Sequence, residues 1–409
     1  GLTMGITGSI FTGMSGLITY SKGLDVISNN VANLNTPGFK GSDLQFRDLF
    51  YNFQWVATQG DQTANEQDGA GVGDKGTTTR FRPGDLQETG NETDAAIDGN
   101  GFFVLRGKDG TVYTRAGQFQ FNDDGVLVRT NSDERVAGLD ENGQLIDITL
   151  EGLRTIAPQA TTEVIFFDNL SSGSNQHVVD DVEIIDGNGE AQTWTVTFTN
   201  NQAETPRSWL IEVADEDGNI ITAGQEIRFQ GNGSPEEGFN RVTFTVTPEE
   251  GDAFDISFFF GEPNSFTRAT SFSGGATSSL AVESQDGFRA GALISVGFTR
   301  DGRLDLEYSN GENQQGPRLA LAWFQDLQAL QQLENAQFVP RGGQQVELGG
   351  AAEGVFGEIV EETVEISNIE LTSEFTDLII VQRGFQASSQ VITVANEMLQ
   401  QLLDMGRGR

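Results

Sequence analysis

The chain has 409 residues, a formal net charge of −36, no cysteine and one histidine. At about 100–200 residues per domain, this length predicts two to four domains. Without cysteine there are no disulfides or thiolate metal sites, and one histidine cannot build a two-histidine metal site. The acidic surplus argues against nucleic acid and anionic membranes as partners, because like charges repel. No apolar run reaches about 18 residues and no basic start leads into an apolar core, so we expect neither a membrane span nor a cleaved signal peptide.

The net charge is unevenly distributed. Residues 1–40 carry Lys22, Lys40 and Asp25, and residues 372–409 carry four acidic and three basic side chains, so the two ends together are neutral. The middle of the chain therefore carries the whole acidic surplus. Neutral, apolar ends around an acidic body indicate a chain whose ends pack inside an assembly while its middle faces water.

Both ends of the chain show the periodicity of paired helices. In residues 5–34, large apolar residues recur every seven positions at Ile10, Leu17, Leu24 and Val31, accompanied by Tyr20, Ile27 and Leu34. In residues 371–405, the same interval joins Leu371, Leu378, Phe385, Ile392 and Leu399, accompanied by Val381, Ala395 and Leu402. A 3–4 spacing kept over four heptads is typical of a coiled-coil seam. We therefore predict that the terminal helices pair and that the nine residues of the two seven-residue series form the assembly interface. The alternative is that each amphipathic helix packs only on its own domain.

The first helix contains four glycines, Gly8, Gly13, Gly16 and Gly23. Each costs about 1 kcal/mol relative to alanine in a helix interior. Such a helix is marginal in isolation, so we expect it to require a partner.

The middle of the chain is predicted to be all-β. Asp-Gly and Asn-Gly pairs, which favour tight hairpin turns, occur thirteen times between residues 68 and 311 and never in the terminal stretches. Between them run short alternating segments, such as residues 193–198, 242–246 and 254–258. In the first of these, Trp194, Val196 and Phe198 share one face. Sandwiches or barrels are the expected architectures.

Motifs for catalysis or cofactor binding are weak. Residues 71–76 match G-x-G-x-x-G, but no apolar strand precedes them and no helix pattern follows, so a linker is the better interpretation. Residues 215–219 resemble a calcium loop, but the glycine stands at the fourth position instead of the sixth. His177 lies near a turn and is interpreted as a surface residue. We therefore predict no catalytic residue, no cofactor, no metal and no enzymatic activity.

Three blocks of sequence identify a family. The first, residues 27–40, reads as the end of a helix, because asparagines tolerate left-handed geometry and Pro37-Gly38 cannot continue a helix. The second comprises residues 86–103 and 113–119, and the third comprises residues 365–375 and 382–387. The motif residues are Asn33, Asn35, Thr36, Gly38, Phe39, Lys40, Ser367, Asn368, Gln382 and Arg383. In composition and order the blocks resemble the bacterial flagellar rod and hook proteins, the axial protein family of the flagellum.

Within that family the chain resembles the hook proteins, because residues 154–289 stand between the halves of a first β domain, where rod proteins largely lack a long insertion. The resemblance implies a mainly β, nested, multi-domain hook architecture with a helical inner domain and two β-rich outer domains. The expected parts are an inner helical tube domain (1–34 with 371–409), a connecting segment (35–80), a first β domain (81–153 with 290–370) and an outer β domain (154–289).

The function implied by the resemblance is structural. Subunits would polymerise into a curved, flexible tube that couples rod to filament and transmits torque. The implied partners are other copies of the chain, the flagellar rod, hook cap and hook–filament junction proteins, and the flagellar export apparatus, with neither nucleic acid nor membrane. The implied location is extracellular, after type III export without a cleaved signal. Two alternatives remain open: a distal rod protein with an inserted β domain, and an extracellular β-sandwich binding module.

Overall fold

The computed structural model describes residues 2–48, 52–53, 67–68, 72–248 and 252–407, and their side chains over residues 7–46, 76–248 and 252–405. The G-x-G-x-x-G match at residues 71–76 begins outside the described residues. The chain divides into two compact units. The first unit comprises residues 1–150, 296–305 and 315–409, and the second comprises residues 151–295 and 306–314.

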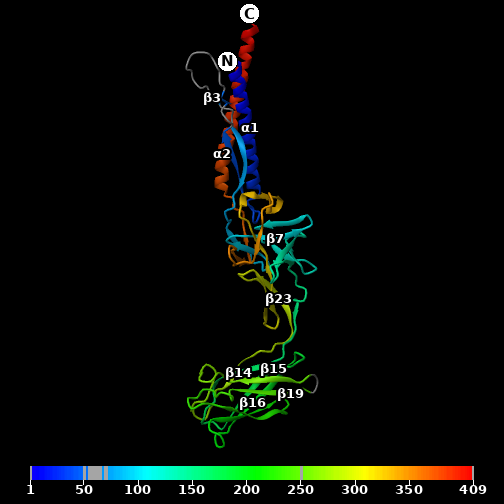
Figure 1. Cartoon of the computed structure of the whole chain (residues 1–409), viewed down its shortest axis with the longest axis vertical. Helices are drawn as coiled ribbons and strands as arrows, with labels where there is room; N and C mark the ends of the chain where they lie inside the picture. Colours follow the sequence, from blue (N-terminus) through cyan, green and yellow to red (C-terminus); the bar gives the residue numbers. More distant parts are fainter. Residues whose placement is uncertain (1, 49–51, 54–66, 69–71, 249–251, 408–409) are drawn as a thin grey trace. The chain divides into compact units, whose positions relative to one another are not determined.

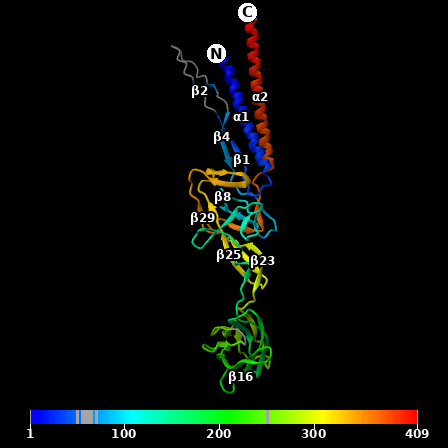
Figure 2. The ribbon, with the colours of Figure 1, turned by 90° about the vertical axis from the view of Figure 1, so that its right-hand side faces the viewer.

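Two long helices belong to the first unit. They are α1, Leu2–Ala32, and α2, Leu371–Arg407. Figures 1 and 2 show them side by side and antiparallel, with both chain termini at the same end of the pair. The pairing of terminal helices predicted from the heptad spacing is confirmed. Helix α1 ends at Ala32, within the predicted helix-ending block 27–40. Gly38, six residues later, has a φ of +69°, a left-handed conformation that suits glycine.

The remainder of the first unit is β structure. Its strands are β1 (Ser42–Asp48), β2 (Asn52–Phe53), β3 (Gln67–Asp68), β4 (Val72–Thr79), β5 (Leu86–Glu88), β6 (Ala95–Asp98), β7 (Phe102–Gly107), β8 (Gly110–Thr114), β9 (Phe119–Phe121), β10 (Leu127–Arg129), β11 (Arg135–Leu139), β12 (Leu145–Asp147), β26 (Leu321–Trp323), β27 (Leu330–Gln332), β28 (Gln337–Pro340), β29 (Glu347–Gly349), β30 (Glu358–Glu361) and β31 (Thr363–Glu365). Short 3₁₀ turns occupy Leu327–Ala329 and Glu334–Ala336.

Strand pairing in this unit joins segments that are far apart in the sequence. The central path runs β11-β7-β8-β28-β27, and β26 also pairs with β7. Outside this sheet, β6 pairs with β30 and β5 pairs with β31. Strand β1 pairs with β4, and both contact α1 (Figure 2). The core beneath the sheet is aromatic, with Tyr113 and Phe324 meeting edge to face at 4.9 Å between ring centroids.

The second unit is a β-sandwich (Figure 1). Its strands are β13 (Thr155–Ile156), β14 (Glu163–Asn169), β15 (Gln176–Ile185), β16 (Ala191–Asn200), β17 (Ser208–Ala214), β18 (Ile220–Arg228), β19 (Arg241–Val246), β20 (Phe254–Phe259), β21 (Ala269–Thr270) and β22 (Ala281–Gln285). Strands β23 (Gly291–Phe298), β24 (Arg303–Tyr308) and β25 (Asn313–Leu319) have residues in both units.

One core joins the two sheets of the sandwich. One sheet is the antiparallel meander β15-β16-β17-β18, and the other has the order β19-β20-β14-β21, with β22 added to β14. Trp194, Val196 and Phe198 all point into the core, as the alternation in residues 193–198 predicts. The all-β prediction for the middle of the chain is confirmed, and the sandwich is the alternative that the second unit adopts.

Turn chemistry accounts for many of the hairpins. In ten of the thirteen Asp-Gly and Asn-Gly pairs, the glycine has a positive φ. Left-handed backbone costs glycine little, so these pairs form their turns without strain. His177 differs from the prediction. It is half-buried, its Nε2 lies 2.7 Å from the Leu280 carbonyl, and its ring stacks near Phe198. Alternate residues of β15 face the core, and His177 is on the same side of the strand as the buried Val179.

The predicted domain boundaries stay predictions. The structure places its own divisions after residues 150, 295, 305 and 314.

The sandwich core predicts a large effect of truncating its central tryptophan. Trp194 is fully buried, so Trp194→Ala should lower the free energy of unfolding of the second unit by about 3–5 kcal/mol. Calorimetry of the full chain would resolve this loss. The exposed Ile220→Ala, in the same unit, should change it by no more than about 0.5 kcal/mol. Equal effects of the two substitutions would contradict the placement of the core.

Candidate assembly interface

The seam between α1 and α2 is lined by glycines. A Cβ atom on Gly13 would lie 2.6 Å from Ile392 Cγ1 and 3.0 Å from the Ser388 backbone oxygen. A Cβ on Gly16 would overlap the Ser388 side chain, and one on Gly23 would lie 3.1 Å from Val381. The two helices therefore approach more closely at this seam than any larger residue would permit.

The seam is reciprocal. On α2, Gly384 packs against the Tyr20 ring of α1, and a Cβ atom on Gly384 would overlap that ring. The Tyr20 ring also lies 5.5 Å from the Phe46 ring of β1, measured between centroids. Strand β1 thus packs beside the helix pair at the same level as the glycine contacts.

The buried face of α1 differs from the series of large apolar residues read from the sequence. Its fully buried positions, among the described side chains, are Gly13, Gly16, Thr19, Gly23, Ile27 and Asn30. They keep a 3–4 spacing, but most are small or polar. The companion positions Ile27, Val381 and Ala395 of the predicted stripes are buried. The two seven-residue series themselves lie at the flanks of the seam. The spacing of the glycines is the signal that could have located the seam itself.

The nine predicted interface residues lie at or near the edges of this seam. Half-buried members are Ile10, Leu17, Leu24, Val31, Leu378, Ile392 and Leu399, and exposed members are Leu371 and Phe385. Ile392 lies against a seam glycine, Gly13. The structure describes one copy of the chain, so the role of all nine between copies stays a prediction.

Much of the rest of the helix pair is apolar and exposed. On α1, Phe11, Met14 and Ile18 share one side, with Phe11 57% exposed. On α2 the exposed residues are Phe375, Ile379, Ile380, Val391, Val394, Met398, Leu403 and Met405. We call these eleven residues the outer apolar surface. So many large apolar side chains exposed on one pair of helices indicate a site of protein–protein contact.

A buried ion cluster lies where both helices join the β structure. Glu365 has no exposed surface, and its carboxylate accepts hydrogen bonds from Lys40 Nζ and, at 2.6 Å, from Arg115 Nε. Burial alone would raise the pKa of Glu365, but the Arg115 guanidinium and the Lys40 ammonium outweigh it and hold the pKa below its ordinary value. Burial lowers the pKa of Lys40, and Glu365 only partly offsets that effect.

Arg115 extends this cluster into the β structure. Its guanidinium donates to the carbonyl oxygens of Ile97 at 2.7 Å, Gly99 at 2.9 Å and Gly101 at 2.7 Å. The cluster therefore joins three segments: the residues after α1, the loop after β8 and the strand before α2. Lys40, from the first sequence block, and Glu365, at the start of the third, are direct partners.

Asn368 holds the same junction through its amide. Its Oδ1 accepts from Gly41 N at 2.9 Å, and its Nδ2 donates to the carbonyls of Arg80 at 2.7 Å and Arg82 at 2.9 Å. Both polar atoms of this side chain are satisfied by backbone, which suits a buried amide. Ser367 is also buried, and its Oγ accepts from Ile369 N at 3.3 Å.

The other motif residues divide into two groups. Phe39 is buried in a small cluster, Thr36 Oγ1 donates to Asn33 Oδ1 at 3.1 Å at the end of α1, and Gly38 approaches the backbone of Ala116 too closely for a Cβ. Asn35, Gln382 and Arg383 are exposed. The structure thus brings Lys40, Ser367 and Asn368 together and leaves these last three at the surface.

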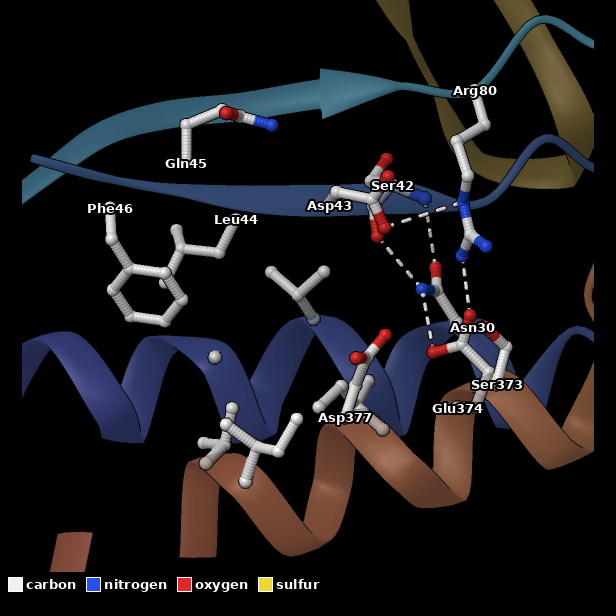
Figure 3. Close-up of a pocket in the computed structure, with 15 residues that line it drawn as sticks. Asn30, Ser42, Asp43, Leu44, Gln45, Phe46, Arg80, Ser373, Glu374 and Asp377 are labelled. Carbon is white, nitrogen blue, oxygen red and sulfur yellow. Dashed lines mark hydrogen bonds and ion pairs between the residues drawn. The ribbon is translucent and has the colours of Figure 1, made fainter. Parts of the chain in front are cut away.

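A second polar contact links the helices near the junction (Figure 3). Asn30 of α1 donates to Glu374 Oε2 of α2 at 3.1 Å and exchanges hydrogen bonds with the backbone of Ser42. Arg80 Nη2 donates to the other oxygen of Glu374, Oε1, and Arg80 Nε lies 3.4 Å from Asp43 Oδ1. Arg80 and Glu374 are functional candidates that the sequence patterns did not indicate.

Neither a metal centre nor a membrane segment is apparent in the described part of the chain. No group of three or more histidine, cysteine, aspartate or glutamate side chains there could hold a metal ion. Among the same residues, no helix combines the length and apolarity needed to cross a membrane.

Family comparisons match three segments of the chain. Residues 10–40 match the model for flagella basal body rod proteins, residues 96–164 match the D1 domain model of flagellar hook proteins FlgE/F/G, and residues 360–405 match the C-terminal model of flagellar basal body rod FlgEFG proteins. The first and third segments contain the helix pair and most of the junction residues. The second contains Arg115.

Individual relatives extend over nearly the whole chain. The flagellar hook protein FlgE of Treponema pallidum is 28% identical, with 98% of this chain and 99% of that protein covered. The flagellar hook protein FlgE of Borreliella burgdorferi is 27% identical, with 97% and 98% covered. The crystal structure of Helicobacter pylori flagellar hook protein FlgE2 is similar at a TM-score of 0.47 and 13% identity, with 68% of this chain and 98% of that chain covered.

The glycine seam predicts opposite effects for two alanine substitutions in α1. Gly8 has nothing within 4 Å of its potential Cβ, so Gly8→Ala should stabilise the helix pair by up to about 1 kcal/mol through helix propensity. Gly13→Ala gains the same propensity but overpacks the seam, so it should destabilise the pair by about 1–2 kcal/mol. Thermal unfolding followed by the helical circular dichroism signal would measure both. Stabilisation by Gly13→Ala would show that the helices do not meet there.

The ion cluster predicts strong dependence on Glu365. Glu365→Gln leaves Lys40 and Arg115 buried without their counter-charge, which should lower the free energy of unfolding by about 3–5 kcal/mol. Glu353→Gln removes the ion-pair partner of Arg318 at a site where Glu353 is 61% exposed. It should lower the free energy of unfolding by no more than about 1 kcal/mol. Denaturant unfolding of both variants would separate a buried cluster from a surface pair.

The same cluster predicts a dependence on acid. The folded-state pKa of Glu365 lies below its unfolded value, so its stabilising contribution is complete above the ordinary carboxyl pKa of about 4.3 and is lost as pH falls through the lower folded value. Unfolding free energies measured from neutral pH into acid should fall less steeply for Glu365→Gln than for the wild type. Parallel curves would contradict an ionised, paired Glu365.

Proposed function

We infer that this chain belongs to the flagellar rod and hook protein family and is a structural subunit of the flagellar hook. The observation that carries this function is the outer apolar surface. Helices α1 and α2 use one face for the glycine seam and leave large apolar side chains uncovered on other faces. Apolar surface of that extent is stabilised when it packs against other copies of the same helix pair. Repetition of that contact gives a polymer.

The helix pair suits the wall of a tube. Each copy supplies two antiparallel helices whose internal contact is already made, so assembly needs only their outward residues. The nine predicted interface residues border the outer apolar surface, and we propose that both sets pack between copies. Close-packed side chains resist continuous deformation, so such a wall would transmit torque.

The second unit supports the hook over the alternatives. It carries twenty-five acidic and six basic residues, a net charge of −19. Charged outer surfaces make wet contacts that can break and re-form, as a curved tube requires when it rotates. A rod protein with an inserted domain is less well supported, because relatives named as hook proteins align over almost their entire length. An extracellular β-sandwich binding module would leave the paired helices and their apolar surface without a role.

We further propose that the hook subunit meets the rod, the hook cap and the hook–filament junction proteins, and that it reaches the cell exterior through the flagellar type III export apparatus. The family resemblance of both terminal segments supports these partners. On this proposal the chain acts as a mechanical element and catalyses no reaction.

Self-assembly through the outer apolar surface can be tested by one charge. Ile379 is 55% exposed, so Ile379→Asp should leave the monomer folded, but it places a carboxylate where neighbouring copies pack. Sedimentation and electron microscopy of the purified chain should then show polymer for the wild type and for Ile379→Val, and at least about tenfold less for Ile379→Asp. Circular dichroism would verify that the variant keeps its helices. Equal polymer from all three proteins would contradict this assembly surface.

A further inference from the structure

A cavity lies between strand β1 and the helix pair (Figure 3). Its volume is about 410 Å³, and it opens beside the polar contact of Asn30 with Glu374. One side of its lining is apolar, with Val26 and Ile27 from α1, Leu44 and Phe46 from β1, and Ile380 and Val381 from α2. The other side carries Asp43, Arg80, Glu374 and Asp377. An occupant would therefore need an apolar stem and a charged end.

The charged side of the cavity holds more carboxylates than cations. Three carboxylates share one guanidinium, because Arg80 pairs with both Asp43 and Glu374. Asp377 has no hydrogen bond or ion pair within the described residues, and Figure 3 shows its carboxylate directed from α2 toward β1. Burial is the main cause that raises the pKa of Asp43; the charges of Glu374 and Asp377 add to it, and Arg80 opposes it.

Among the described side chains of the helix pair, one cation suits this cavity. Within the described side chains, Arg383 is exposed and makes no hydrogen bond or ion pair, whereas Lys22 of α1 already has an interaction. Six residues separate Asp377 from Arg383 on α2. At about 100° per residue, the two side chains point about 120° apart, so Arg383 is directed away from the cavity of its own chain. It is available to a neighbour.

We propose that this cavity accepts Arg383 of a second copy of the chain, a proposal that rests on the self-assembly inferred above. The guanidinium pairs with Asp377 and Asp43, and the aliphatic stem lies against the apolar lining, as arginine side chains commonly do. Donor and acceptor are different parts of the surface, so the contact is heterologous. Repeated contacts of this type produce an open helical polymer instead of a closed dimer.

Charge reversal across the contact tests the proposal. Arg383→Glu and Asp377→Arg should each lower the yield of sedimented polymer at least about tenfold, because each places like charges together. The double variant carries an inverted pair between copies, so it should recover polymer to within about threefold of the wild type. Glu397→Arg, an equal charge reversal at an exposed site of α2 outside the cavity, should leave the yield within about twofold.

The outcomes separate this proposal from the proposed function. If the wild type polymerises and Arg383→Glu does so equally, or if the double variant stays as defective as the single variants, the cavity contact is overturned while hook assembly stands. An equal loss for Glu397→Arg also overturns it, because net charge would then be the cause. If the wild type forms no polymer in any tested buffer, the proposed function falls and this contact falls with it. Circular dichroism of every variant identifies any that has lost its helices.

Discussion

Glu365 is buried without contact with water, so its charge must be balanced by side chains that the rest of the chain delivers to it. Lys40 lies in the residues after α1, and Arg115 lies in the loop after β8. Glu365 is the last residue of β31, a short distance before α2 begins. A buried carboxylate deprived of either cation is strongly destabilising, which makes the meeting of these three segments a condition of the fold. The antiparallel entry of both helices, the position of β1 beside them and the cavity between them all depend on this junction.

The glycine seam depends on the junction in turn. The cluster fixes where α1 ends and where α2 begins, so it sets the register of the two helices at this end of the pair. Next to the cluster, Asn30 of α1 donates a hydrogen bond to Glu374 of α2. Farther along, Gly13 and Gly16 meet Ser388 and Ile392. Close approach there leaves many large apolar residues of both helices exposed outside the pair. Small residues thus make much of the contact within the pair, and large apolar residues on its outside are free to contact other copies. This arrangement suits a subunit of a polymer.

Sequence patterns anticipated the parts of the fold that depend on local chemistry. Heptad spacing located both helices, alternation placed Trp194 and Phe198 in the sandwich core, and Asn-Gly and Asp-Gly pairs marked the hairpins. Patterns of large apolar residues located only part of the seam, such as Ile27 and Val381, because glycine contributes no hydrophobic signal. Nor could they pair Lys40 with Glu365, since a contact across most of the chain leaves no local trace. The family motif named Lys40, Ser367 and Asn368 without explaining them, and their hydrogen bonds supply the reason.

The antiparallel pairing of the chain termini has a consequence for the order of folding. Everything from the end of α1 to the start of α2 forms the loop that this contact closes, so the seam is among the contacts of highest sequence separation in the molecule. Contacts of that kind form late, because the ordering of the intervening chain precedes them. On the export route proposed above, a chain that leaves a channel with its first residues in front would hold α1 without a partner until its last residues are free. Its helix pair would then be complete only after release, and association with other subunits would wait until the whole chain is outside.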